Sequence, residues 1–168
     1  GFAYVDKWPG APDWPSELLW QMKWFHAFIW ASGGCFNDFY VHVIDHCCWM
    51  KNDWPVEAQA LGGRHYKLAA NGNPCIDQNF DVYAVEYTFA DGAKLFLDGR
   101  CIPGTEQIYS SYLHGTKGFA VASKAGDCGG PSSIYKGQKV DGDAMVWESK
   151  TPKGEENPYQ NEWNDLID

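Results

Sequence analysis

The sequence predicts an α+β fold, with helices packed on one face of an open, largely antiparallel β-sheet. Helical features dominate the chain up to Pro55. Beyond Pro55, apolar and polar side chains alternate with the period of two that is typical of strands. An Asp91-Gly92 pair between two alternating stretches indicates a hairpin turn, so the strands on either side are expected to run antiparallel.

Two helices are expected before Pro55 and another near the last residue. Ser16 can cap a helix that extends to about Phe25. A longer helix is expected over residues 35–51, because proline and the residue before it disfavour helix continuation. Pro158 suits the first turn of a final helix, which would be truncated where the sequence stops.

Strands are expected where Val, Tyr and Phe alternate with other residues. These stretches are 56–61, 80–89, 94–101, 109–114 and 119–122. Residues 123–144 are rich in Gly, Ser and Lys, which indicates loops around short edge strands. The proline-rich residues 1–15 predict an irregular entry segment, so residues 16–168 are expected to form the domain proper.

Composition excludes several classes of partner. The net charge of −9 and the pI of about 4.9 argue against nucleic acid and anionic membranes, which need clustered Lys and Arg. No apolar run approaches the ~20 residues of a membrane span, and no signal peptide is recognised. Localisation stays open, with cytoplasm slightly favoured over export.

The cysteines show no C-x-x-C spacing, so we expect mostly free thiols, although their even number also permits disulfides. They are Cys35, Cys47, Cys48, Cys75, Cys101 and Cys128.

The most informative segment is 32–45, in which Asp38, His42 and Asp45 stand at i, i+4 and i+7. On a helix these side chains would share one face, between apolar neighbours. A carboxylate one turn before a histidine can orient the imidazole and stabilise its protonated form, as a general base requires. A solvent-exposed face of a two-sided helix would produce the same spacing. Gly33 and Gly34 permit a tight turn just upstream.

Other candidates for the site have simpler alternatives. Trp24 and Trp30, with Trp20, could pack flat rings against a sugar, although aromatic residues more often fill a core. Arg64 could reach a substrate or a phosphate, whereas an arginine at a strand end more often pairs with a nearby carboxylate. His26, His65 and His114 are expected to be packing or surface residues.

Several blocks of sequence, taken in order, indicate a family. They are Gly33-Gly34 with Asp38-x-x-x-His42-x-x-Asp45 and Trp49, residues 55–64, residues 81–87 through Asp91-Gly92 to Arg100, residues 115–118, and residues 157–167. With these blocks the chain resembles the C-terminal domain of the glucose–fructose oxidoreductase, inositol dehydrogenase and rhizopine-catabolism (Gfo/Idh/MocA) family.

The resemblance implies half of a two-domain NAD- or NADP-dependent dehydrogenase. Its fold would be the dihydrodipicolinate-reductase-like sheet that carries the substrate pocket and the oligomer contacts. The G-x-G-x-x-G turn of a Rossmann domain is missing from this sequence, as is the family's catalytic lysine. We therefore expect no cofactor bound to this chain itself, and residues 16–168 would be the substrate-binding and oligomerisation domain.

The resemblance also implies roles for individual residues. His42 would accept the hydroxyl proton of a sugar, polyol or related CH–OH substrate while hydride leaves for the nicotinamide. Asp38 would assist His42, and Asp45 would contact the substrate. Family members commonly associate through the sheet face, so a homodimer or a larger oligomer is expected.

Two other functions are compatible with the residues. In His42-Val-Ile-Asp-His46, two imidazoles at i and i+4 have a spacing that suits zinc, which would indicate a metal-binding, hydrolase-like domain. The chain could also be a non-catalytic assembly domain.

Overall fold

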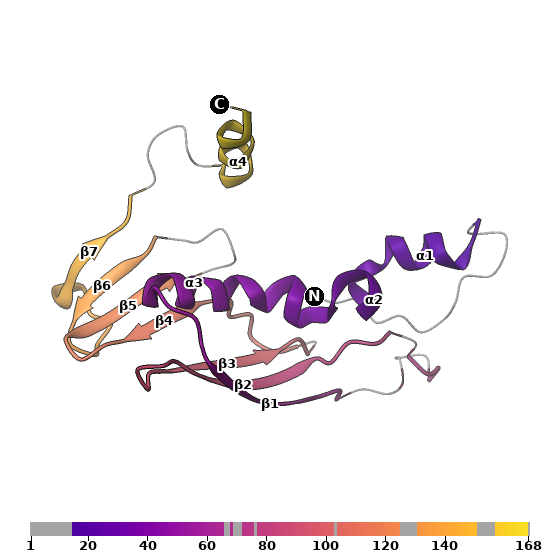
Figure 1. Cartoon of the computed structure of the whole chain (residues 1–168), viewed down its shortest axis with the longest axis horizontal. Helices are drawn as coiled ribbons and strands as arrows, with labels where there is room; N and C mark the ends of the chain where they lie inside the picture. Colours follow the sequence, from indigo (N-terminus) through magenta and orange to yellow (C-terminus); the bar gives the residue numbers. More distant parts are fainter. Residues whose placement is uncertain are drawn as a thin grey trace. The chain divides into compact units, whose positions relative to one another are not determined.

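The structure is a computed structural model that describes residues 15–65, 68, 72–75, 77–102, 104–124, 131–150 and 157–167. The expected entry segment lies outside the described residues, apart from Pro15. The chain divides into two compact units, Gly1–Glu106 and Gln107–Asp168, which are considered separately. The described elements confirm the α+β class: helices accompany two open antiparallel sheets, of three and four strands (Figure 1).

The first unit begins with short helices. Ser16 caps α1 (Glu17–Lys23) as predicted, since its side chain accepts a hydrogen bond of 3.2 Å from the backbone N–H of Leu19. The helix ends slightly before Phe25, and a 3₁₀ turn, η1 (Phe25–Ala27), leads into α2 (Ile29–Ser32). Trp20 is buried edge-on against Phe28, so this tryptophan belongs to the core.

The helix expected over 35–51 is present in two parts. A π turn, η2 (Phe36–Tyr40), continues directly into α3 (Val41–Lys51). The helix ends at Lys51 and is capped by Asn52, which adopts the left-handed conformation with φ of 53°. None of the helices in the described ranges is both long and apolar enough to cross a membrane.

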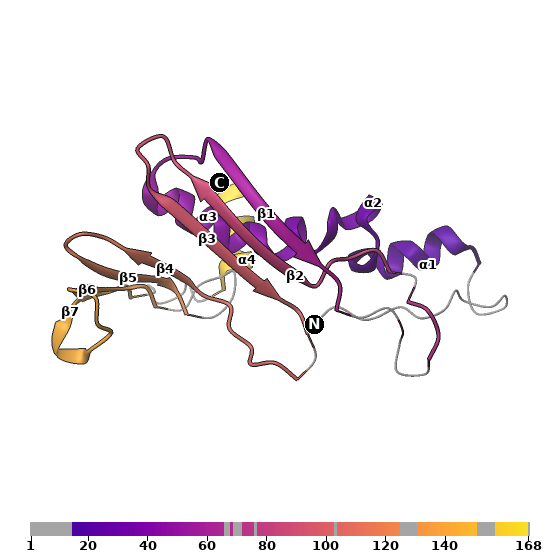
Figure 2. The ribbon, with the colours of Figure 1, turned by 90° about the horizontal axis from the view of Figure 1, so that it is seen from below.

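The first sheet is a meander of three strands, β1 (Glu57–Gly63), β2 (Val82–Thr88) and β3 (Lys94–Arg100), in the order β1-β2-β3. The predicted hairpin joins β2 to β3, and Gly92 supplies the positive φ of its turn. The helix formed by η2 and α3 runs along one face of this sheet (Figures 1 and 2).

The two faces of the first sheet differ in character. Tyr83, Val85 and Tyr87 point to the helix-covered face, where Tyr83 meets the ring of Tyr40 edge-on with centroids 5.3 Å apart. The opposite face of β1–β3 is mostly charged and polar. Four apolar side chains lie there, Leu61, Val82, Ala84 and Phe96. They stand among charged and polar ones: Glu57, Gln59, Glu86, Thr88, Lys94, Asp98 and Arg100.

The second unit holds the remaining strands, β4 (Ser111–His114), β5 (Gly118–Ser123), β6 (Ser133–Lys136) and β7 (Met145–Glu148). They pair in chain order as a second antiparallel sheet, with the short turn η3 (Gly142–Ala144) before β7 and helix α4 (Pro158–Ile167) after it. Phe119, Val121 and Tyr135 form the buried cluster of this unit. The sequence predicted a single sheet, whereas the described strands divide between two.

Candidate functional site

Two consecutive glycines open the helical stretch that carries the predicted site. Gly33 and Gly34 have φ values of 71° and 82°, a conformation that favours glycine. A Cβ atom on Gly34 would lie 3.2 Å from Oδ1 of Asn79, so the backbone passes close to a neighbouring loop. The predicted tight turn is confirmed, and the close approach is to the chain itself.

Asp38 pairs with a histidine other than the one that its spacing indicated. Its carboxylate accepts a hydrogen bond from Nδ1 of His26 in η1. The His26 ring also lies 3.9 Å from the Phe25 ring and 5.7 Å from the Phe39 ring, between centroids. This pairing is a contact between separate elements, which an i, i+4 rule cannot anticipate.

His42 and Asp45 are exposed on α3. The opposite side of the same helical stretch is buried, through Tyr40, Val43 and Cys48. The stretch therefore has one face packed on the sheet and another that presents an imidazole and a carboxylate outward. Asp38 is half-buried at the start of that stretch, with 21% of its side chain exposed.

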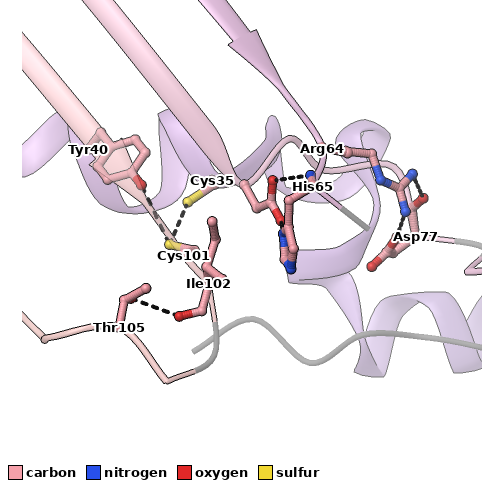
Figure 3. Close-up of polar contacts among 9 residues, drawn as sticks. Cys35, Tyr40, Arg64, His65, Asp77, Cys101, Ile102 and Thr105 are labelled. Atoms are coloured by element: carbon pink, nitrogen blue, oxygen red, sulfur yellow. Dashed lines mark hydrogen bonds and ion pairs between the residues drawn. The ribbon is translucent and has the colours of Figure 1, made fainter. Parts of the chain in front are cut away.

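Polar side chains shortly before β2, Asp77 and Asp81, bind the two residues that follow β1, Arg64 and His65. Arg64 donates from Nη1 to the backbone carbonyl of Asp77 at 2.8 Å, and its Nη2 pairs with the Asp77 carboxylate (Figure 3). His65 donates its backbone N–H to Asp81 at 3.1 Å, and its ring pairs with the same carboxylate. Arg64 thus follows the simpler of its two interpretations, pairing with a nearby carboxylate.

Sequence reasoning missed this loop and the partner of Asp38. Asp77, Asn79 and Asp81 are all buried, and Asn79 donates from Nδ2 to the backbone carbonyl of His26. The alternation Asp-x-Asn-x-Asp just ahead of a strand was the available signal, because alternate residues of an extended chain point the same way. Nothing local in the sequence connected His26 with Asp38.

The two remaining tryptophan candidates lie on the surface of the first unit. Trp24 and Trp30 are 40% and 56% exposed. Nε1 of Trp30 donates to Oε1 of Gln21 at 2.6 Å, which fixes the indole against α1. These exposed rings retain the option of packing against a ligand, whereas Trp20 does not.

The described residues give no support to the alternative of a metal site. Within the part of the chain that the structure describes, no group of three or more His, Cys, Asp and Glu side chains is arranged to hold a metal ion. His42 and His46 therefore have no third ligand among these residues, and structural zinc sites use four.

The fold and the site together define an α+β protein with imidazoles and carboxylates on one helical stretch beside an antiparallel sheet. Comparison with protein-family models finds no match, and no curated protein matches the chain.

Proposed function

We propose that this chain is the substrate-binding and acid/base half of a nicotinamide-dependent oxidoreductase acting on the CH–OH group of a sugar, polyol or related substrate. The observation that carries the proposal is the two-faced helical stretch 36–51. Its buried face packs on the sheet, while His42 and Asp45 are exposed. An outward titratable face beside a rigid sheet suits a site that a second domain completes.

The chain's own share of the reaction is proton transfer and orientation. His42 accepts the proton of the substrate hydroxyl, because histidine is the side chain whose ordinary pKa lies nearest to neutrality. Asp38 lies one turn earlier and adds negative charge that favours the resulting imidazolium, and its pairing with His26 holds the carboxylate in position. Asp45 accepts a hydrogen bond from a second hydroxyl, and Trp24 and Trp30 offer flat apolar surface to the sugar ring.

In this proposal the dinucleotide belongs to another domain. All strand ladders among the described residues are antiparallel, whereas the dinucleotide turn joins a parallel strand to the start of a helix. NAD or NADP would accordingly bind to a domain outside this chain, and we expect the isolated 168-residue chain to bind neither.

The test is an activity assay on the protein as its gene encodes it, with NAD and NADP and a panel of sugars and polyols. Formation of reduced nicotinamide, followed by absorbance, is the expected result for at least one substrate. Failure of every substrate with both cofactors, in a protein that contains a dinucleotide domain, would count against the assignment. A gene that encodes no such domain would instead favour the assembly-domain alternative.

A further inference from the structure

Two thiols meet where the helical stretch faces the end of β3. Cys35 directly precedes the π turn, and Cys101 directly follows β3. Their Sγ atoms lie 3.6 Å apart although the residues are 66 positions apart in the chain (Figure 3). Both cysteines are free thiols in this structure.

The two sulfurs have unequal surroundings. Cys35 is fully buried, whereas Cys101 is partly exposed. Hydrogen bonds from Cys35 and, at 3.5 Å, from the hydroxyl of Tyr40 lower the pKa of Cys101 to about 6, against the opposing effect of burial. The same contact and burial raise the pKa of Cys35. Cys101 is therefore the more acidic thiol of the pair, because full burial disfavours a thiolate at Cys35.

Cys47 and Cys48, both on α3, lack this combination. Burial raises the pKa of Cys47 to about 11 and also raises that of Cys48, so both stay protonated near neutrality. Cys47 consequently serves as a matched internal control.

We propose that Cys35 and Cys101 form a redox-sensitive dithiol that a hydroperoxide converts to a disulfide. This inference goes beyond the proposed function and does not depend on it. The Cys101 thiolate attacks one peroxide oxygen, the O–O bond breaks, and Cys101 becomes a sulfenic acid while hydroxide leaves. Cys35 then loses its proton and attacks the Cys101 sulfur, the S–O bond breaks, and water leaves. The two sulfurs together lose two electrons, and hydrogen peroxide is reduced to one water and one hydroxide. The hydroxide becomes a second water by taking up the proton that Cys101 had released to solvent.

Closure needs only a small movement. A disulfide has an S–S distance of about 2.05 Å, so the sulfurs must approach by about 1.5 Å. The bond would tie the start of the π turn, three residues before Asp38, to the end of β3. Oxidation therefore restrains the segment that carries the candidate acid/base residues, and a thiol reductant reverses it.

The test uses the whole reduced chain, treated with hydrogen peroxide, alkylated and analysed by peptide mass spectrometry. We expect a cross-linked peptide containing Cys35 and Cys101 that disappears after reduction. Cys35→Ala should leave Cys101 as a sulfenic acid that dimedone traps, and Cys47→Ala should form the cross-link like the wild type. If the wild-type chain shows no such cross-link, or joins either cysteine preferentially to another, the proposal fails, whatever the folding of the variants.

Alkylation kinetics give a second readout. The rate at Cys101 should reach half its maximum at a lower pH than for an ordinary cysteine, because only the thiolate reacts and the pKa of Cys101 is lowered. Cys35→Ala removes a hydrogen-bond donor and should move this midpoint to higher pH. A midpoint near that of an ordinary cysteine in the wild-type chain would overturn the assignment of Cys101 as the attacking thiol.

Discussion

The His42 side chain is the residue on which the proposed chemistry depends most directly. In the active protein, His42→Ala should lower kcat by roughly a hundredfold or more, the scale of a lost general base. The matched control is His114→Ala, since His114 is exposed in the second unit and pairs with Gln138 at 2.9 Å. Steady-state kinetics would reject the role of His42 if both variants kept the wild-type kcat.

The ion pair between Arg64 and Asp77 shows how burial sets the contribution of such a pair to the free energy of unfolding. Only 3% of the Asp77 side chain is exposed, so Arg64→Met would leave a buried carboxylate without its charged partner. We expect a loss of about 3 kcal/mol in the free energy of unfolding, toward the lower end for a buried pair because Arg64 is partly exposed.

A surface pair supplies the control for Arg64. Lys94 and Glu86 lie 2.8 Å apart with 42% of each side chain exposed, so Lys94→Met should cost less than about 1 kcal/mol. Urea unfolding of both variants tests the difference. Equal losses would show that Asp77 does not depend on Arg64.

At the scale of elements, Gly99 controls how closely the helix approaches the sheet. A Cβ atom on Gly99 would overlap the ring of Tyr40, which is itself buried. Gly99→Ala should therefore destabilise the chain by about 1–3 kcal/mol through overpacking. Gly63→Ala in β1 meets nothing within 4 Å and should be neutral or slightly stabilising. Denaturant midpoints that moved equally for the two variants would contradict this packing.

The same elements show what sequence patterns can predict. Strands β2 and β3 and their Gly92 turn follow from alternation and a short turn signal, which are local properties. The pairing of His26 with Asp38 and the contact of Cys35 with Cys101 join residues far apart in the chain. Such contacts depend on how the elements pack, which no local spacing encodes. For the same reason, the division of the strands into two sheets was not anticipated.

At the scale of the whole molecule, the family resemblance predicts a homodimer formed through a sheet face. The first sheet is poorly suited to dimer formation, because its face opposite the helix is largely charged and polar. The second sheet carries a continuous apolar row across its strands. In register, Leu113 stands opposite Ala120, Ala120 opposite Ile134, and Ile134 opposite Trp147. Ile134 and Trp147 are 44% and 50% exposed, so the row offers apolar area that association would bury.

We therefore expect the wild-type chain to be at least a dimer by light scattering, with Trp147→Glu shifting it toward monomer. A charge placed in an apolar interface loses hydration without gaining a partner, which is why this single change should suffice. Phe96→Glu is the matched control, because Phe96 is 68% exposed on the charged face of the first sheet. Dissociation by Phe96→Glu and not by Trp147→Glu would show that the interface lies on the first sheet. A wild-type chain that is monomeric at micromolar concentration would exclude stable association through either face.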